Sequence, residues 1–205
     1  MTVNVQKRRR YRVKRVSHPS SRSSLSPAKR IYLLLTAISA AGVFIGASSG
    51  INSELPFELR AENSFVDSFV GSLAAVMLYV VICFFAGTSS AGSLFGYLLC
   101  LFKGMGAGFL SAEIFRYGSA SVNVSDALNV LPFEAASIAA VIFAARENIR
   151  MSHLISEKAF GKSSGGGEGT DCLRLYLMKF GVITLLAVGA ALMDGLMTVI
   201  AGKMP

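Results

Sequence analysis

Charged residues are scarce in this chain of 205 residues. Asp, Glu, Lys and Arg make up 16% of the sequence, whereas hydrophobic residues make up 53% and the mean hydropathy is +0.55. A soluble domain of this length normally has about a quarter of its residues charged. The apolar residues here fall into blocks of roughly twenty, which is the length of helix that crosses about 30 Å of hydrocarbon. The composition therefore disfavours a soluble protein and predicts an all-α, polytopic membrane helix bundle.

Residues that commonly build metal sites, disulfides and active sites are also few. The cysteines and histidines are spread along the chain: Cys83, Cys100, Cys172, His18 and His153. They form no C-x-x-C pair and no cluster at metal-ligand spacing. The sequence also lacks the G-x-S-x-G, P-loop and H-E-x-x-H motifs. We therefore expect no metal, no cofactor and no catalytic residues, in a protein that is not an enzyme.

Positive charge is concentrated at the N-terminus. Ten of the twenty Lys and Arg residues precede residue 31. The segment 1–30 has too few apolar residues to fold alone, so we expect a disordered basic cytoplasmic arm. An arm directly before a span acts as a topology determinant and is attracted to anionic lipid. Membrane lipid is thus a predicted partner, and nucleic acid is not.

Five apolar blocks follow the arm. The expected spans lie at about 31–51, 65–86, 93–112, 127–145 and 175–200, so that 31–205 forms a transmembrane bundle with a loop at about 146–174. The first part of this loop, to about residue 160, is expected to extend the fourth helix. The first block exceeds the roughly 7–15 apolar residues of a signal peptide, which favours a retained signal-anchor over cleavage.

The basic residues also predict an orientation in the cell membrane. With the N-terminus inside, the cytoplasmic side has ten Lys and Arg in the arm and six more in or beside the 146–174 loop. The outside has three, namely Arg60, Arg116 and Lys203. Because cytoplasmic segments are enriched in Lys and Arg, this asymmetry predicts a multi-pass inner-membrane protein with its N-terminus in the cytoplasm and its C-terminus outside.

Glycines recur at four-residue spacing in two of the expected spans. Gly42, Gly46 and Gly50 form one such series in the first span, and Gly104 and Gly108 form another in the third. In lipid, small residues on one helix face let two backbones approach closely. These faces are predicted to pack helices within the bundle or, alternatively, to bind another membrane protein.

Three ionisable residues fall within the spans, at Lys103, Glu134 and Asp194. A charge at the bilayer centre costs a few kcal/mol on insertion scales, so these side chains should face the bundle interior and find partners. One interpretation is a structural pair between Lys103 and either acid, which would fix the packing of two helices. The other is a path for protons or ions.

Three short motifs in the spans are similar to those of a known family. The segment 101–109, LFKGMGAGF, resembles the F-K-G-x-x-x-G-F signature of the stage II sporulation protein M family. The segment 131–136, LPFEAA, resembles its L-P-x-x-x-x-E signature, and 191–195, ALMDG, resembles its A-x-I-E-A ending. The acid follows the proline at a different distance here, and Asp194 replaces a glutamate.

The resemblance implies a non-enzymatic membrane scaffold. A member of this family positions peptidoglycan hydrolases, the sporulation proteins D and P, at the septum, where they remodel septal peptidoglycan for forespore engulfment during sporulation. The alternative is a small membrane transporter or permease-like subunit that uses Lys103, Glu134 and Asp194.

Overall fold

The computed structural model describes residues 26–51, 64–117, 124–159 and 169–201. Most of the predicted basic arm, 1–25, lies outside the described residues. The same is true of 160–168 in the expected cytoplasmic loop and of the last four residues, 202–205.

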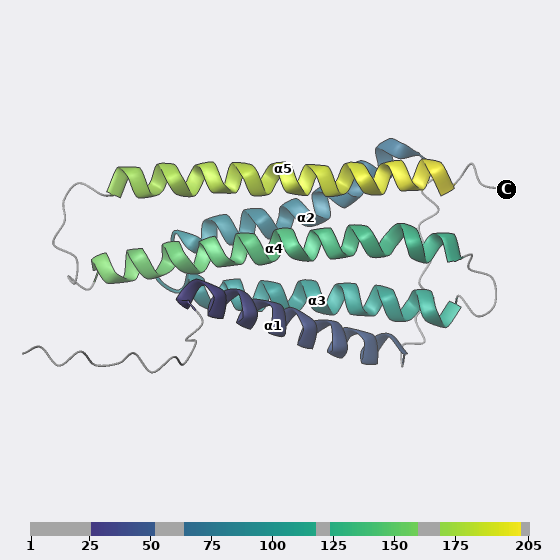
Figure 1. Ribbon diagram of the computed structural model, residues 1–205, viewed down its shortest axis with the longest axis horizontal. Helices are drawn as coiled ribbons and strands as arrows, with labels where there is room; N and C mark the ends of the chain where they lie inside the picture. The colour runs from purple at the N-terminus through teal and green to yellow at the C-terminus, as the bar shows by residue number, and fades with distance from the viewer. Residues whose placement is uncertain (1–25, 52–63, 118–123, 160–168, 202–205) are drawn as a thin grey trace, which may run out of the picture.

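The described residues form a bundle of five helices, which confirms the all-α fold (Figure 1). The helices are α1 (Pro27–Ile51), α2 (Phe65–Gly87), α3 (Gly92–Tyr117), α4 (Val124–Ala159) and α5 (Gly169–Ala201). A helix satisfies its backbone hydrogen bonds internally, which is the condition for an apolar segment to exist in lipid. Much of the 146–174 segment is helical, because α4 continues to Ala159 and α5 already begins at Gly169.

Four of these helices are long and apolar enough to cross a membrane. The qualifying segments are Ala28–Ile51, Phe65–Gly87, Gly92–Arg116 and Cys172–Ile200. The protein is therefore a membrane protein by the length and composition of its helices. The fourth expected span, 127–145, lies within α4, which is not among the four and has Glu134, Arg146 and Glu147 in its apolar stretch.

The surface and the interior have the polarity expected in lipid. Large apolar side chains such as Phe44, Leu78 and Leu185 are exposed on the outer faces of α1, α2 and α5. Charged side chains, including Lys103 and Glu134, are buried between helices. Contiguous exposed apolar surface on this scale is uncommon on soluble monomers, whereas it is the normal lipid-facing surface of a membrane bundle.

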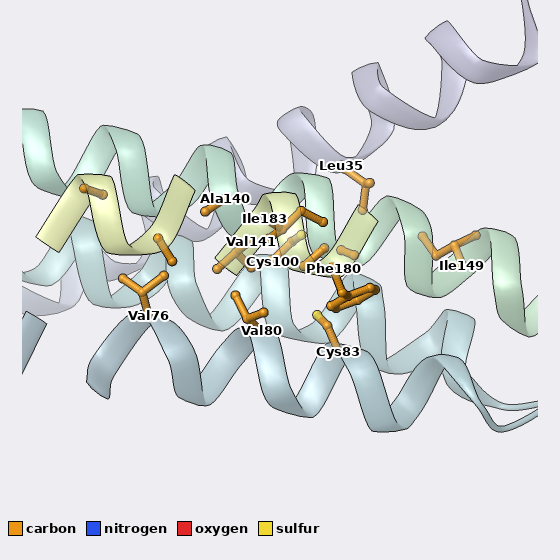
Figure 2. Close-up of a cluster of buried hydrophobic side chains, with 14 of the residues drawn as sticks. Leu35, Val76, Val80, Cys83, Cys100, Ala140, Val141, Ile149, Phe180 and Ile183 are labelled. Carbon is orange, nitrogen blue, oxygen red and sulfur yellow. The ribbon is translucent and has the colours of Figure 1, made fainter. Parts of the chain in front are cut away.

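Helix α4 is the centre of the bundle. Within the described parts of the chain, it contacts all four other helices, whereas α1 and α5 do not contact each other. Its buried face includes the small residues Ala140, Ala144 and Ala145, which let neighbouring helices approach closely. Figure 2 shows the resulting core, to which each helix contributes; its labelled members are Leu35, Val76, Val80, Cys83, Cys100, Ala140, Val141, Ile149, Phe180 and Ile183.

The α2–α3 connection is a tight turn, as the short 87–92 segment predicts. Thr88 Oγ1 donates to the carbonyl oxygen of Phe85 at 2.7 Å, and Ser89 Oγ donates to that of Ala86 at 2.9 Å. These bonds use carbonyl groups at the end of α2 that have no partner within the helix. Helices α2 and α3 therefore run antiparallel (Figure 1).

The glycine series of α1 and α3 face each other. A Cβ atom at Gly46 would overlap the carbonyl oxygen of Met105, and one at Gly108 would overlap that of Val43. Gly42 and Gly104 approach the opposite backbone in the same way. The structure thus places both glycine faces inside the bundle, where they hold α1 against α3.

Gly108→Ala should destabilise the bundle, because its Cβ has no space against the α1 backbone. Overpacking of this kind costs about 1–3 kcal/mol. Gly106→Ala is the matched control, since this glycine is on the same helix and a Cβ there meets nothing within 4 Å. We expect a lower thermal midpoint in detergent for Gly108→Ala than for Gly106→Ala. Equal midpoints would show that close approach of α1 and α3 is not required.

Candidate functional site

A buried salt bridge joins α3 to α4. Lys103 Nζ lies 2.7 Å from Glu134 Oε2, and about a tenth or less of either side chain is exposed. The Lys103 ammonium also lies 5.8 Å from the centre of the Phe133 ring, within range of a cation–π interaction. Of the two acids that the sequence offers, the structure therefore pairs Lys103 with Glu134.

Ser137 lies beside this pair on α4. Its hydroxyl oxygen lies 2.9 Å from the Glu134 carbonyl oxygen and 3.4 Å from Glu134 Oε2. Because a buried ion pair is favourable only when its remaining polar atoms are satisfied, a hydroxyl one turn along the helix is a useful neighbour. Ser137 could not be singled out from the sequence, because a serine in an apolar helix gives no signal unless its partner is known.

Asp194 belongs to a different interface, between α5 and α2. Its Oδ2 atom accepts a hydrogen bond from Ser68 Oγ at 3.1 Å and another from Ser72 Oγ. Thr198 extends the network, with its hydroxyl 3.0 Å from Ser68 Oγ. The three ionisable residues therefore do not form one cluster: Lys103 and Glu134 connect α3 to α4, and Asp194 connects α5 to α2.

A third polar cluster, which we call the basic cluster, surrounds Glu147 on α4. Glu147 is buried, and its carboxylate contacts Arg146 at 3.0 Å, Arg150 at 3.5 Å and Lys179 of α5 at 2.9 Å. The Arg146 guanidinium also lies 4.6 Å from the centre of the Tyr32 ring of α1. From the sequence these basic residues were predicted only as topology determinants, and Glu147, which binds three of them, was not identified.

Within the described ranges, no group of three or more His, Cys, Asp and Glu residues is placed to hold a metal ion. Three sets of polar groups inside the bundle make contacts between helices: an ion pair for α3–α4, hydroxyl–carboxylate bonds for α2–α5, and the basic cluster for α4–α5. The side-chain amide of Asn148 is also buried, but it has no hydrogen-bond partner among the described residues. What this arrangement can do chemically is to fix the rotation and register of helices that lipid alone would leave free to slide.

The contribution of the buried pair can be measured with a double-mutant cycle. Lys103→Met leaves a buried carboxylate without its cation, and Glu134→Leu leaves a buried ammonium, so each should cost about 3–5 kcal/mol. The double variant Lys103→Met/Glu134→Leu should recover most of this loss, because it leaves neither charge unpaired. Thermal unfolding in detergent measures the effect, and a double variant as unstable as the two single losses added together would contradict the assignment.

Comparisons of the chain with protein-family models, with curated proteins and with solved structures give no match. The resemblance to the stage II sporulation protein M family therefore stays a prediction from the three motifs, two of which contain the residues of the α3–α4 ion pair.

Proposed function

We propose that this protein is a non-enzymatic membrane scaffold whose five-helix bundle positions partner proteins. The observation that carries the proposal is the α3–α4 ion pair. Its ammonium and carboxylate lie 2.7 Å apart, both side chains are about a tenth exposed or less, and Ser137 lies beside the acid. A pair closed in this way stabilises one arrangement of helices, whereas carriers use sites at broken helices that open alternately to the two sides.

In the proposed topology α4 also crosses the membrane, so that the bundle has five spans in all. Helix α3 ends at one end of the bundle and α5 begins at the other, so α4 must return the chain between them (Figure 1). Its charged and polar side chains are tolerated because the surrounding helices shield them from lipid. The start of α1, the end of α4 and the start of α5 lie toward the same end of the bundle (Figure 1). The basic residues in the halves of these helices nearest that end are Lys29, Arg30, Arg146, Arg150, Lys158, Arg174 and Lys179.

That basic end is the proposed cytoplasmic side, in accord with the positive-inside rule. At the opposite end, Arg116 is the basic residue among those described. The N-terminal arm is then cytoplasmic, and the C-terminus and the α1–α2 and α3–α4 connections are outside. This places the outer end of the bundle on the side where cell-wall enzymes act.

The proposed partners are peptidoglycan hydrolases, the sporulation proteins D and P of the engulfment complex. This assignment is supported by the motif resemblance at 101–109, 131–136 and 191–195. A scaffold for such enzymes needs a rigid bundle and no catalytic groups of its own, and the interhelical contacts described above would supply that rigidity.

Affinity purification of the full-length tagged protein from cells undergoing asymmetric septation tests the proposal. We expect peptidoglycan hydrolases to co-purify, and a fluorescent fusion to gather at the septum. The variant Lys103→Met/Glu134→Leu should retain both properties, because it keeps the fold while removing the charges. Recovery of no hydrolase, together with normal engulfment in a deletion strain, would contradict the scaffold.

The same double variant separates the scaffold from the transporter. A transporter that uses Lys103 and Glu134 would lose its flux when both charges are removed, although the protein still folds. Solute or ion flux in proteoliposomes that depends on Lys103 would overturn the proposal in favour of the transporter.

A further inference from the structure

A groove runs along α4 between α1 and α5, at the basic end of the bundle. Its volume is about 390 Å³. Residues of α4 and α5 line most of it, and α1 contributes Tyr32. Helices α1 and α5 do not contact each other in the described ranges. The groove opens at the bundle surface, where Phe143, Val182 and Leu186 are all more than a third exposed.

One end of the groove is strongly basic. Arg146 and Lys179 line it, and both contact the buried Glu147 carboxylate. Arg150 contacts the same carboxylate from the adjoining turn of α4. One acid and three bases leave a local excess of two positive charges, on side chains that remain between about a quarter and a half exposed. Such an excess is complementary to a phosphate group.

The other end of the groove is apolar. On α5, Val182 and Leu186 lie three and seven residues after Lys179, on the same helix face. On α4, which runs antiparallel to α5, Phe143 lies one turn before Arg146. Both helices thus change from basic to apolar in the same direction, from the bundle end toward its middle. A ligand that matches this surface has an anionic head and a hydrocarbon chain.

We propose that this groove binds one acidic phospholipid from the leaflet at the basic end of the bundle. Its phosphate lies between Arg146 and Lys179, and one acyl chain lies along Phe143, Val182 and Leu186. Glu147 holds the two cations in place before the lipid arrives. The Tyr32 ring, 4.6 Å from the Arg146 guanidinium, restricts that side chain from the α1 side. Basic pockets between membrane helices are a recognised type of lipid headgroup site.

Native mass spectrometry of the full-length protein can test the site with defined probes. Phosphatidylglycerol and phosphatidylcholine with identical acyl chains differ in net charge, and we expect one phosphatidylglycerol to be retained in preference. Arg146→Gln and Lys179→Gln should each weaken retention by about fivefold. Arg174→Gln is the control, because this exposed arginine of α5 is outside the groove.

A second pair of variants leaves the charges unchanged. Val182→Trp fills the apolar half of the groove and should reduce phosphatidylglycerol retention by a similar factor. Leu185→Trp adds the same side chain at an exposed position of α5 that does not line the groove, and should have no effect. This pair keeps the test valid if loss of Arg146 or Lys179 unfolds the protein by leaving Glu147 unpaired.

The results separate a lipid site from a site for soluble anions. Inorganic phosphate at millimolar concentration should not displace phosphatidylglycerol, because it gains nothing from the apolar half. Displacement by phosphate would overturn the proposal, as would equal retention by Val182→Trp and Leu185→Trp. Equal retention of the two lipids by the unaltered protein would also overturn it.

Discussion

Helix α4 carries more polar and ionisable side chains than a helix facing lipid can tolerate, and the bundle is arranged to cover them. Glu134, Ser137, Glu147 and Asn148 are all buried along its length. An unpaired charge or an unsatisfied polar group in hydrocarbon costs several kcal/mol, so α4 has to be surrounded. Glu134 and Glu147 meet cations on α3 and α5, and Ser137 bonds within α4. The side-chain amide of Asn148, in contrast, is shielded from lipid without a hydrogen-bond partner among the described residues. The position of α4 in contact with every other helix follows from this requirement.

The neighbours of α4 are held in two different ways. Between α1 and α3 the contact depends on shape, since glycines on both sides allow the backbones to touch. Around α4 and between α2 and α5 it depends on polar groups, in the Lys103–Glu134 pair and the Ser68–Asp194 bond. Lipid tails are as apolar as leucine, so apolar burial cannot order helices in a membrane, and close packing with interhelical hydrogen bonds takes that role. This supports the view that the charged residues of this bundle are structural.

The sequence predicted the helices well and their pairing poorly, for physical reasons. Blocks of apolar residues define spans, and a charge inside such a block is conspicuous, which is why Lys103, Glu134 and Asp194 could be singled out. Which acid meets Lys103 depends on how each helix is rotated and which helix lies beside it, and no local pattern contains that information. The contact between the glycines of α1 and α3 was easier to predict, because in both helices the glycines recur every four residues and so lie on one face. The cluster around Glu147 could not be predicted, because in the sequence a single acid among several basic residues is typical of an exposed charged surface. Only the packing of α5 against α4 places Lys179 beside Glu147.

We propose that α4 crosses the membrane in contact with the four other helices. Site-specific labelling of two positions that flank it gives the most direct measurement. On a background in which Cys83, Cys100 and Cys172 are replaced, single cysteines are introduced at Arg116, near the end of α3, and at Lys158, near the end of α4. With an impermeant maleimide, residue 116 should react in intact cells and residue 158 only after the membrane is opened. Reaction of both positions from the same side would contradict the account.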